Sequence, residues 1–371
     1  MSKQRISWID IAKSIGIAAI VLGHCSSGNL QCICFSFNSI IFFTLAGMTF
    51  CRKREETDAY LSFDSGRTLK VFLRDLFQTL GIPYLFWGIV SILIYALMGR
   101  LTVNALNMDQ SHFEIGSNVI SLIYGNSDTG YFEWNRPLWF LPCLFLVELL
   151  WFFILTTSQR FCKTRKQLWI VYASVMVLSA ANMFFISYSK HKFVLAFEME
   201  TAISMMFFFG VGLLCRNDKF LGLIHKHLLS GKKALQYFYF AGGTGLAIVL
   251  SVANGLTDTR SDAYSNVFLY ILNALCASFA VIFISRIING NTILEYIGQR
   301  TMAILVMHKF PIMFIRVFFP FLDKKISEGN IICEIMIGMF TIGSCLAVEK
   351  IIRMIAPAVF GKGRRRSLKE I

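Results

Sequence analysis

Charged residues are scarce in this sequence, and that scarcity narrows its class. Only 16% of the 371 residues are charged, whereas 56% are hydrophobic and 15% are aromatic. An ordinary soluble domain carries about 25% charged residues, so we expect a membrane protein built from helices. The ten cysteines are scattered and form no CxxC pair. This pattern predicts buried thiols, with a disulfide among Cys25, Cys32 and Cys34 as the alternative.

Several catalytic and binding motifs are also missing. The sequence contains no GxSxG elbow, no Walker loop, no glycine-rich nucleotide fingerprint and no metal-ligand cluster. We therefore expect no bound cofactor and no metal. A covalent serine intermediate has little support, although Ser26 and Ser27 adjoin His24 and leave a serine relay open.

Hydrophobic runs and basic loops together predict the topology. The formal net charge of +14 does not indicate nucleic-acid binding, because Lys and Arg gather in alternate loops, 26 on one side and seven on the other. By the positive-inside rule, both termini are cytoplasmic. No repeat relates the two halves, which weakens the case for a transporter of duplicated bundles. About ten segments are predicted to span the membrane: 8–24, 33–50, 78–98, 137–155, 168–186, 201–214, 234–253, 266–284, 301–320 and 331–351.

The first of these segments is apolar but holds three ionisable residues. At 100° per residue, the eleven-residue step from Lys13 to His24 is within about 20° of three full turns, so both side chains share one helix face. They are roughly 16 Å apart along the axis. Asp10 is three residues from Lys13, so a structural ion pair is the alternative to a functional role. A lone interfacial His24 is, likewise, often only a satisfied polar residue.

Other ionisable residues occur in or beside later segments. Ionisable groups inside a membrane are costly and often functional. His308 is predicted to lie about eight residues into an outward-running helix, either hydrogen-bonding a neighbouring helix or acting in catalysis. Arg316 follows on the same helix, and Glu148 on the fourth would orient a histidine or pair with Arg316. Glu198 and Glu200 are expected to be solvated at a helix end, with acceptor contact as the alternative.

Five motifs occur in order along the chain: IDIAKSIGIAAIVLGH (9–24), FFTLAG (42–47), GIPYLFWGI (81–89), RPLWFLPCLFLVELL (136–150) and YIGQRTMAILVMHKFP (296–311). Together they resemble the acyltransferase 3 family, in particular its sugar O-acetylase-like branch. The family consists of integral membrane enzymes that O-acylate cell-envelope glycans and similar acceptors. The resemblance spans essentially the whole chain and implies a single all-α polytopic domain over residues 1–355, followed by a basic cytoplasmic tail, 356–371.

The resemblance also implies roles for individual residues. His24 would be the catalytic residue and Lys13 would hold the acyl donor, expected to be acetyl-CoA. Ala46 stands where the family's FFxxSG has Ser, so that hydroxyl is not essential here. The family's RxxR, which the resemblance implies binds the donor, would fall near residues 76 and 79. Only Arg74 remains close by, on a predicted interfacial helix over 65–77, and it is therefore the second candidate for donor binding beside Lys13. Trp139, although part of the LWFL signature, is expected to pack.

These observations favour a multi-pass O-acyltransferase of the inner (plasma) membrane. It would use acyl-CoA to modify a surface polysaccharide or its lipid-linked precursor, with the His24 imidazole as general base. One alternative is a carrier or flippase for glycan intermediates, whose buried charges line a pathway. Another is an inactive relative that serves as a subunit alongside glycan-assembly proteins.

Overall fold

The protein is a bundle of helices. The computed structural model describes residues 6–50, 68–106, 115–127, 129, 133–189, 194–215 and 233–361. These residues form helices and no β-strand, which confirms the all-α prediction. In chain order, the elements are α1 (Ser7–Cys25), α2 (Gly28–Phe35), α3 (Ile40–Phe50), α4 (Leu69–Leu76), the π-helical η1 (Phe77–Gly81), α5 (Ile82–Leu106), α6 (Ile115–Tyr124), η3 (Glu133–Trp139), α7 (Phe140–Phe161), α8 (Arg165–Tyr188), η4 (Ala196–Glu198), α9 (Met199–Cys215), α11 (Lys233–Asn254), α12 (Val267–Ile287), α13 (Thr292–Gly298), α14 (Thr301–Met307), α15 (Lys309–Phe318), α16 (Pro320–Ser327), α17 (Ile331–Ile355) and η6 (Pro357–Phe360).

Nine helical stretches in the described part of the chain are long and apolar enough to cross a membrane. They correspond to nine of the ten predicted segments. The remaining one, 234–253, lies in α11, whose described apolar run, Phe240–Asn254, is shorter. The prediction of a polytopic helix bundle is therefore confirmed, while the cytoplasmic placement of both termini stays a prediction.

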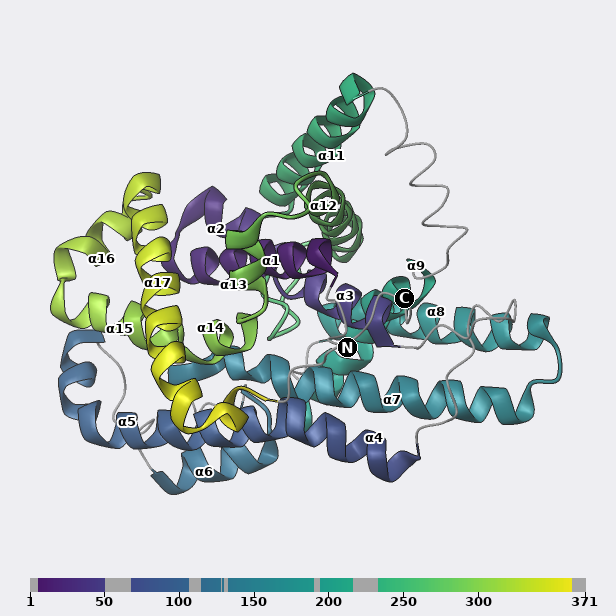
Figure 1. Ribbon diagram of the computed structural model, residues 1–371, viewed down its shortest axis with the longest axis horizontal. Helices are drawn as coiled ribbons and strands as arrows, with labels where there is room; N and C mark the ends of the chain where they lie inside the picture. The colour runs from purple at the N-terminus through teal and green to yellow at the C-terminus, as the bar shows by residue number, and fades with distance from the viewer. Residues whose placement is uncertain are drawn as a thin grey trace.

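Helix α1 lies at the centre of the bundle. It packs against α2, α3, α12, α13, α14 and α17, and Figure 1 shows it surrounded by elements from both ends of the chain. Residues on all its sides are buried, including Ile11, Ile17 and Val21. Helices α11 and α12 lie side by side and project from the rest of the bundle (Figure 1).

Two predicted spanning helices are interrupted. The segment 33–50 breaks at residues 36–39, where the Ser36 hydroxyl donates to the Ile33 carbonyl at 2.7 Å and the Asn38 side chain accepts from the Ser39 amide at 2.6 Å. Such local bonds compete with the helix ladder. The late helix breaks at His308, between α14 and α15. Pro311 explains this break because it has no N–H for the Met307 carbonyl and its ring crowds that carbonyl.

Glycines allow the closest helix contacts. A Cβ on Gly47 would lie 2.0 Å from the Phe209 carbonyl oxygen, and one on Gly212 would lie 2.0 Å from that of Thr44. Helices α3 and α9 therefore cross backbone to backbone. A Cβ on Gly298 would lie 1.7 Å from the Asp10 carbonyl oxygen, so α13 rests directly on the first turn of α1.

Residues just after α17 also pack on the bundle. The indole N–H of Trp87 donates to the Val359 carbonyl at 3.0 Å, and the ring of Phe360 stacks on Trp87 with centroids 5.6 Å apart. The packed part thus extends to residue 361, six residues past the predicted boundary at 355; the cytoplasmic tail itself stays a prediction. Residues 362–371 lie outside the described residues.

Candidate functional site

A cavity of about 280 Å³ lies beside α1. One part of its lining is apolar and includes Ile17, Ile20, Phe42, Phe140 and Leu144. The rest is polar or charged and includes Asp10, Lys13, Thr79, Glu148, Gln299, Arg300 and Arg353. The cavity therefore has an apolar wall and, beside it, several charged side chains, which are costly inside a membrane-spanning bundle.

The face of α1 that carries Lys13 continues along the helix to His24. Lys13, Ile17 and Ile20 all line the cavity, spaced four and three residues apart, and His24 follows four residues after Ile20. On the facing wall Leu305 lines the cavity, and His308 follows three residues later. Neither histidine lines the cavity itself. The cavity ends about one helical turn from both imidazoles.

The two histidines form a stacked pair. Their ring centroids are 5.2 Å apart with planes at 28°, and the ring of Phe35 meets His24 edge-on at 5.3 Å. His24 keeps partial solvent exposure. Within the described part of the chain, no group hydrogen-bonds to its ring nitrogens. Among the described residues, His24 is therefore a partly exposed imidazole held by ring contacts and not by hydrogen bonds.

His308 has a different environment. It is fully buried, and its Nδ1 lies 3.1 Å from the Ile304 carbonyl and 2.8 Å from that of Leu305. Because carbonyls only accept, Nδ1 must carry the proton, and Nε2 then has a lone pair. Nε2 has no hydrogen-bond partner among the described residues. The predicted hydrogen bond to a neighbouring helix was wrong, because Nδ1 bonds to the same helix and the contact between helices is the ring stack on His24.

The end of α1 beyond His24 is held by polar contacts. The Ser26 hydroxyl donates to the Leu22 carbonyl at 2.7 Å, and the Ser27 hydroxyl donates to the Ile326 carbonyl at 2.7 Å. The Ser27 amide donates to the buried carboxylate of Glu334 at 2.9 Å. Neither hydroxyl is directed at His24, which gives a serine relay no geometric support. The cysteines at this end, Cys25, Cys32 and Cys34, are free thiols.

The polar part of the cavity contains two arginines that the sequence interpretation missed. Arg300 and Arg353 both contact the buried carboxylate of Glu349, Arg300 at 3.3 Å. Lys13 pairs with Asp10 at 3.6 Å in the same cavity. Three cations from α1, the start of α14 and α17 thus line the same cavity, whereas the sequence interpretation had assigned donor binding to Lys13 and Arg74. One signal was available: Arg300 lies inside the family-like segment 296–311.

The other predicted site residues have varied positions. Glu148 is buried in the cavity wall. Arg74 is exposed on α4 and does not line the cavity, whereas Thr79, near the expected RxxR, does. Trp139 packs edge-on against Phe140. Arg316 pairs with Asp323 at 3.2 Å instead of the suggested Glu148.

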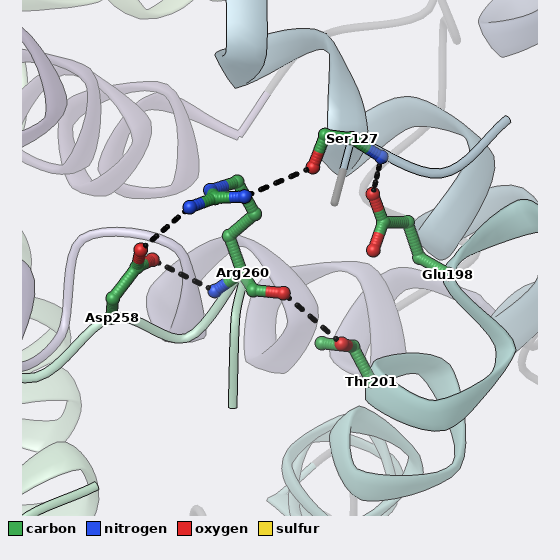
Figure 2. A network of polar contacts seen from close by, with 5 residues as sticks. All are labelled: Ser127, Glu198, Thr201, Asp258 and Arg260. Carbon is green, nitrogen blue, oxygen red and sulfur yellow. Dashed lines mark hydrogen bonds and ion pairs between the residues drawn. The ribbon is translucent and has the colours of Figure 1, made fainter. Parts of the chain in front are cut away.

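A polar network joins the loops between helices (Figure 2). Arg260 lies 3.1 Å from Asp258 and donates to the Ser127 hydroxyl at 3.5 Å, while the Ser127 amide donates to Glu198 at 2.7 Å. The expectation that Glu198 and Glu200 are solvated was wrong, since both are buried. Glu200 accepts from the Asn126 amide group at 2.6 Å. Folding of the loops onto η4 and α9 covers these carboxylates, which no local pattern predicts.

Asp262 extends this network with neutral donors. It accepts from the Thr201 hydroxyl and the Tyr264 phenol, both at 2.8 Å. Burial, and then the Asp262 carboxylate, raise the pKa of Tyr264 well above its usual range. Tyr264 therefore remains a protonated donor at neutral pH, and its phenol and the Thr201 hydroxyl both stabilise the Asp262 carboxylate.

Comparison with known proteins agrees with this architecture. The model of the acyltransferase 3 family, described as an acyltransferase domain, matches residues 6–349. Searches of curated proteins and of solved structures found no match. The matched region includes α1, both histidines and all but the last of the cations that line the cavity. This chain therefore belongs to the acyltransferase 3 family and is a multi-pass membrane acyltransferase.

Proposed function

We propose that this enzyme transfers an acetyl group from acetyl-CoA to a hydroxyl of a cell-surface polysaccharide or its lipid-linked precursor, in the inner membrane. The observation that carries the proposal is the cavity beside α1. Cations line one part of it, and its apolar wall ends one turn from an accessible imidazole. An anionic, long-armed thioester donor suits that combination.

Lys13, Arg300 and Arg353 would bind the phosphates of the donor. Guanidinium groups match phosphate oxygens bidentately, and an ammonium supplies a point charge. Glu349 fixes the two guanidinium groups in place. These arginines would bind the donor phosphates in place of the family's RxxR motif, which this chain lacks. At about 280 Å³, the cavity is near the lower limit of the ~300–1,000 Å³ of typical ligand pockets. It would therefore hold the pantetheine arm and acyl group, with the nucleotide left at the mouth.

His24 would act as the general base. Its imidazole takes the proton of the acceptor hydroxyl as the oxygen attacks the thioester carbonyl. The tetrahedral intermediate then collapses, the C–S bond breaks, and the imidazolium gives its proton to the departing thiolate. The products are an acyl ester and free CoA. Lys13 and His24 are roughly 16 Å apart along α1, a span that an extended pantetheine arm is suited to cover.

His308 would support His24 without taking part in the proton transfer. Its Nδ1 proton is committed to two carbonyls and its Nε2 is sealed from solvent. The neutral ring therefore offers a π-face beside His24. Such a face stabilises a cation by about 0.5–2 kcal/mol, which favours the imidazolium formed during transfer.

The direct test is acyl transfer by the purified protein. Detergent-solubilised enzyme is incubated with acetyl-CoA labelled in the acetyl group and with envelope glycan from a strain that lacks the protein. Label in glycan ester, released by mild base, is the expected result. Release of labelled acetate with no glycan ester, at any enzyme concentration, would contradict the proposal. Mass spectrometry of surface glycan from deletion and parent strains gives the matching test in cells.

A further inference from the structure

Lys309 lies beside the two histidines and, among the described residues, has no counter-ion. It directly follows His308 and begins α15. Lys13, Arg260 and Arg316 each have a carboxylate within 4 Å, namely Asp10, Asp258 and Asp323. Lys309 has no ion pair or hydrogen bond with any residue that the structure describes. It is half-buried, so its ammonium group is partly removed from water.

Further cations surround Lys309. Arg136, Arg260 and Arg316 all lie within electrostatic range of its ammonium group. Lys309, Arg260 and Arg316 lie within the same range of His24. Arg136 belongs to η3, Arg260 to the loop between α11 and α12, and Lys309 and Arg316 to α15. Figure 2 shows Arg260 at the centre of its loop network, reaching toward Ser127.

This cluster is separate from the residues that line the cavity. The cavity is lined by residues of α14 up to Leu305, before His308, whereas Lys309 and Arg316 follow His308. None of Arg136, Arg260, Lys309 and Arg316 lines the cavity. The donor phosphates proposed at Lys13 and Arg300 therefore do not explain these charges.

Charge balance indicates what the cluster binds. A half-buried cation with like charges around it is unfavourable unless an anion joins it. The carboxylates that contact members of this cluster are already engaged, since Asp258 pairs with Arg260 and Asp323 pairs with Arg316. The missing anion is therefore expected from a ligand that approaches His24 beside these cations.

We propose that Lys309, with Arg316 and Arg260, binds a negatively charged group of the acceptor, so that the enzyme acylates acidic glycans or phosphate-linked sugars in preference to neutral ones. This inference rests on the proposed function, because an acceptor exists only if the acyl group is transferred. A carboxylate and a phosphate are the two sources of the required charge. Either one would place a neighbouring hydroxyl beside the accessible face of His24.

Binding of three sugars tests the site independently of catalysis. Thermal unfolding of the purified protein is followed in saturating CoA, which occupies the donor site, with methyl glucoside, methyl glucuronide or glucose 1-phosphate added. We expect one or both anionic sugars to raise the unfolding midpoint at concentrations at least tenfold below those needed for methyl glucoside. Lys309→Gln should abolish this difference. Lys325→Gln should not, although it removes a positive charge from an exposed site on α16.

Transfer rates then connect the site to the reaction. In wild type, kcat/KM for the better anionic sugar should exceed that for methyl glucoside at least tenfold, and Lys309→Gln should bring this ratio to about one, whereas Lys325→Gln should leave it unchanged. The proposal is overturned by equal midpoint shifts for all three sugars, by no shift with any of them, or by an equal loss of kcat with charged and neutral acceptors. It is also overturned if Arg300→Gln, and not Lys309→Gln, removes the sugar effect. Charge-indifferent transfer would refute the anion site alone, whereas anion binding without any transfer would refute the acyltransfer proposal.

Discussion

The rings of His24 and His308 stack with centroids 5.2 Å apart, although the two residues are 284 positions apart in the chain. The Nδ1 proton of His308 is committed to backbone carbonyls, while His24 has no hydrogen-bonded partner in the described structure. The two imidazoles therefore differ in their ability to take up a proton. His308 is buried and held by its own helix, whereas His24 is partly exposed and able to accept a proton.

This division predicts how His308 substitutions behave. His308→Ala removes the stack and should lower kcat about 2- to 30-fold, corresponding to a cation–π contribution of about 0.5–2 kcal/mol. The KM for acetyl-CoA should change little, because His308 does not line the cavity. His308→Phe retains an aromatic face and should recover most of the rate. A larger defect in His308→Phe than in His308→Ala would mean that His308 acts through a nitrogen.

The cavity cations predict a donor-specific defect. Arg300→Gln or Arg353→Gln should raise the KM for acetyl-CoA about tenfold or more, since a charge-assisted hydrogen bond contributes about 1.5–3 kcal/mol. Neither change should alter the KM for acetyl-pantetheine, because this donor lacks the nucleotide and its phosphates. Arg74→Gln is the matched control, because Arg74 is exposed outside the cavity. Steady-state kinetics with both donors measure these KM values. A larger increase in the KM for acetyl-CoA in Arg74→Gln than in the other two variants would indicate that the donor phosphates bind at α4.

Ala46 predicts a steric test. It lines the cavity where the family pattern has Ser. Ala46→Ser should leave activity within about twofold, because its hydroxyl would fit the same space. Ala46→Leu places a larger side chain in the cavity that the donor would occupy. The resulting overpacking cost of about 1–3 kcal/mol should reduce kcat/KM for acetyl-CoA on the order of tenfold. Unchanged kinetics in Ala46→Leu, with normal unfolding behaviour, would place the donor elsewhere.

Gly298 predicts a defect in helix packing. Its missing Cβ lets α13 rest on the Asp10 carbonyl, so Gly298→Ala must push the two helices apart. We expect this variant to lose about 1–3 kcal/mol of stability and to unfold at a lower temperature in detergent. Gly343→Ala in α17 is the control, since a Cβ there meets nothing within 4 Å. Equal midpoints for the two variants would show that the close contact does not govern stability.

The sequence predicted those features that depend on local periodicity. Helix α1 follows from a 3.6-residue repeat in an apolar run, and the same repeat led to the prediction that Lys13 and His24 share one face of it. The break at His308 was missed, although Pro311 three residues later carries the signal. The family resemblance identified the enzyme class, which also sets aside the carrier alternative.

Contacts between distant segments were not predictable. Arg300 and Arg353 come together only through Glu349, and the Arg260 network depends on how three loops fold together. A single sequence gives the distance along a helix but not the partner across a cavity. For the same reason Arg74, the nearest basic residue in the chain, was chosen for the donor in place of Arg300.

The rate of acetyl transfer by His24→Ala, compared with wild type, tests the central claim most directly. Binding of CoA to both proteins is measured first, by the CoA-induced shift in unfolding temperature, so that a folding defect is recognised. We predict an unchanged shift and a loss of transfer of about 10²- to 10⁴-fold, the usual contribution of a general base. Transfer at the wild-type rate by a His24→Ala enzyme that binds CoA normally would contradict the account.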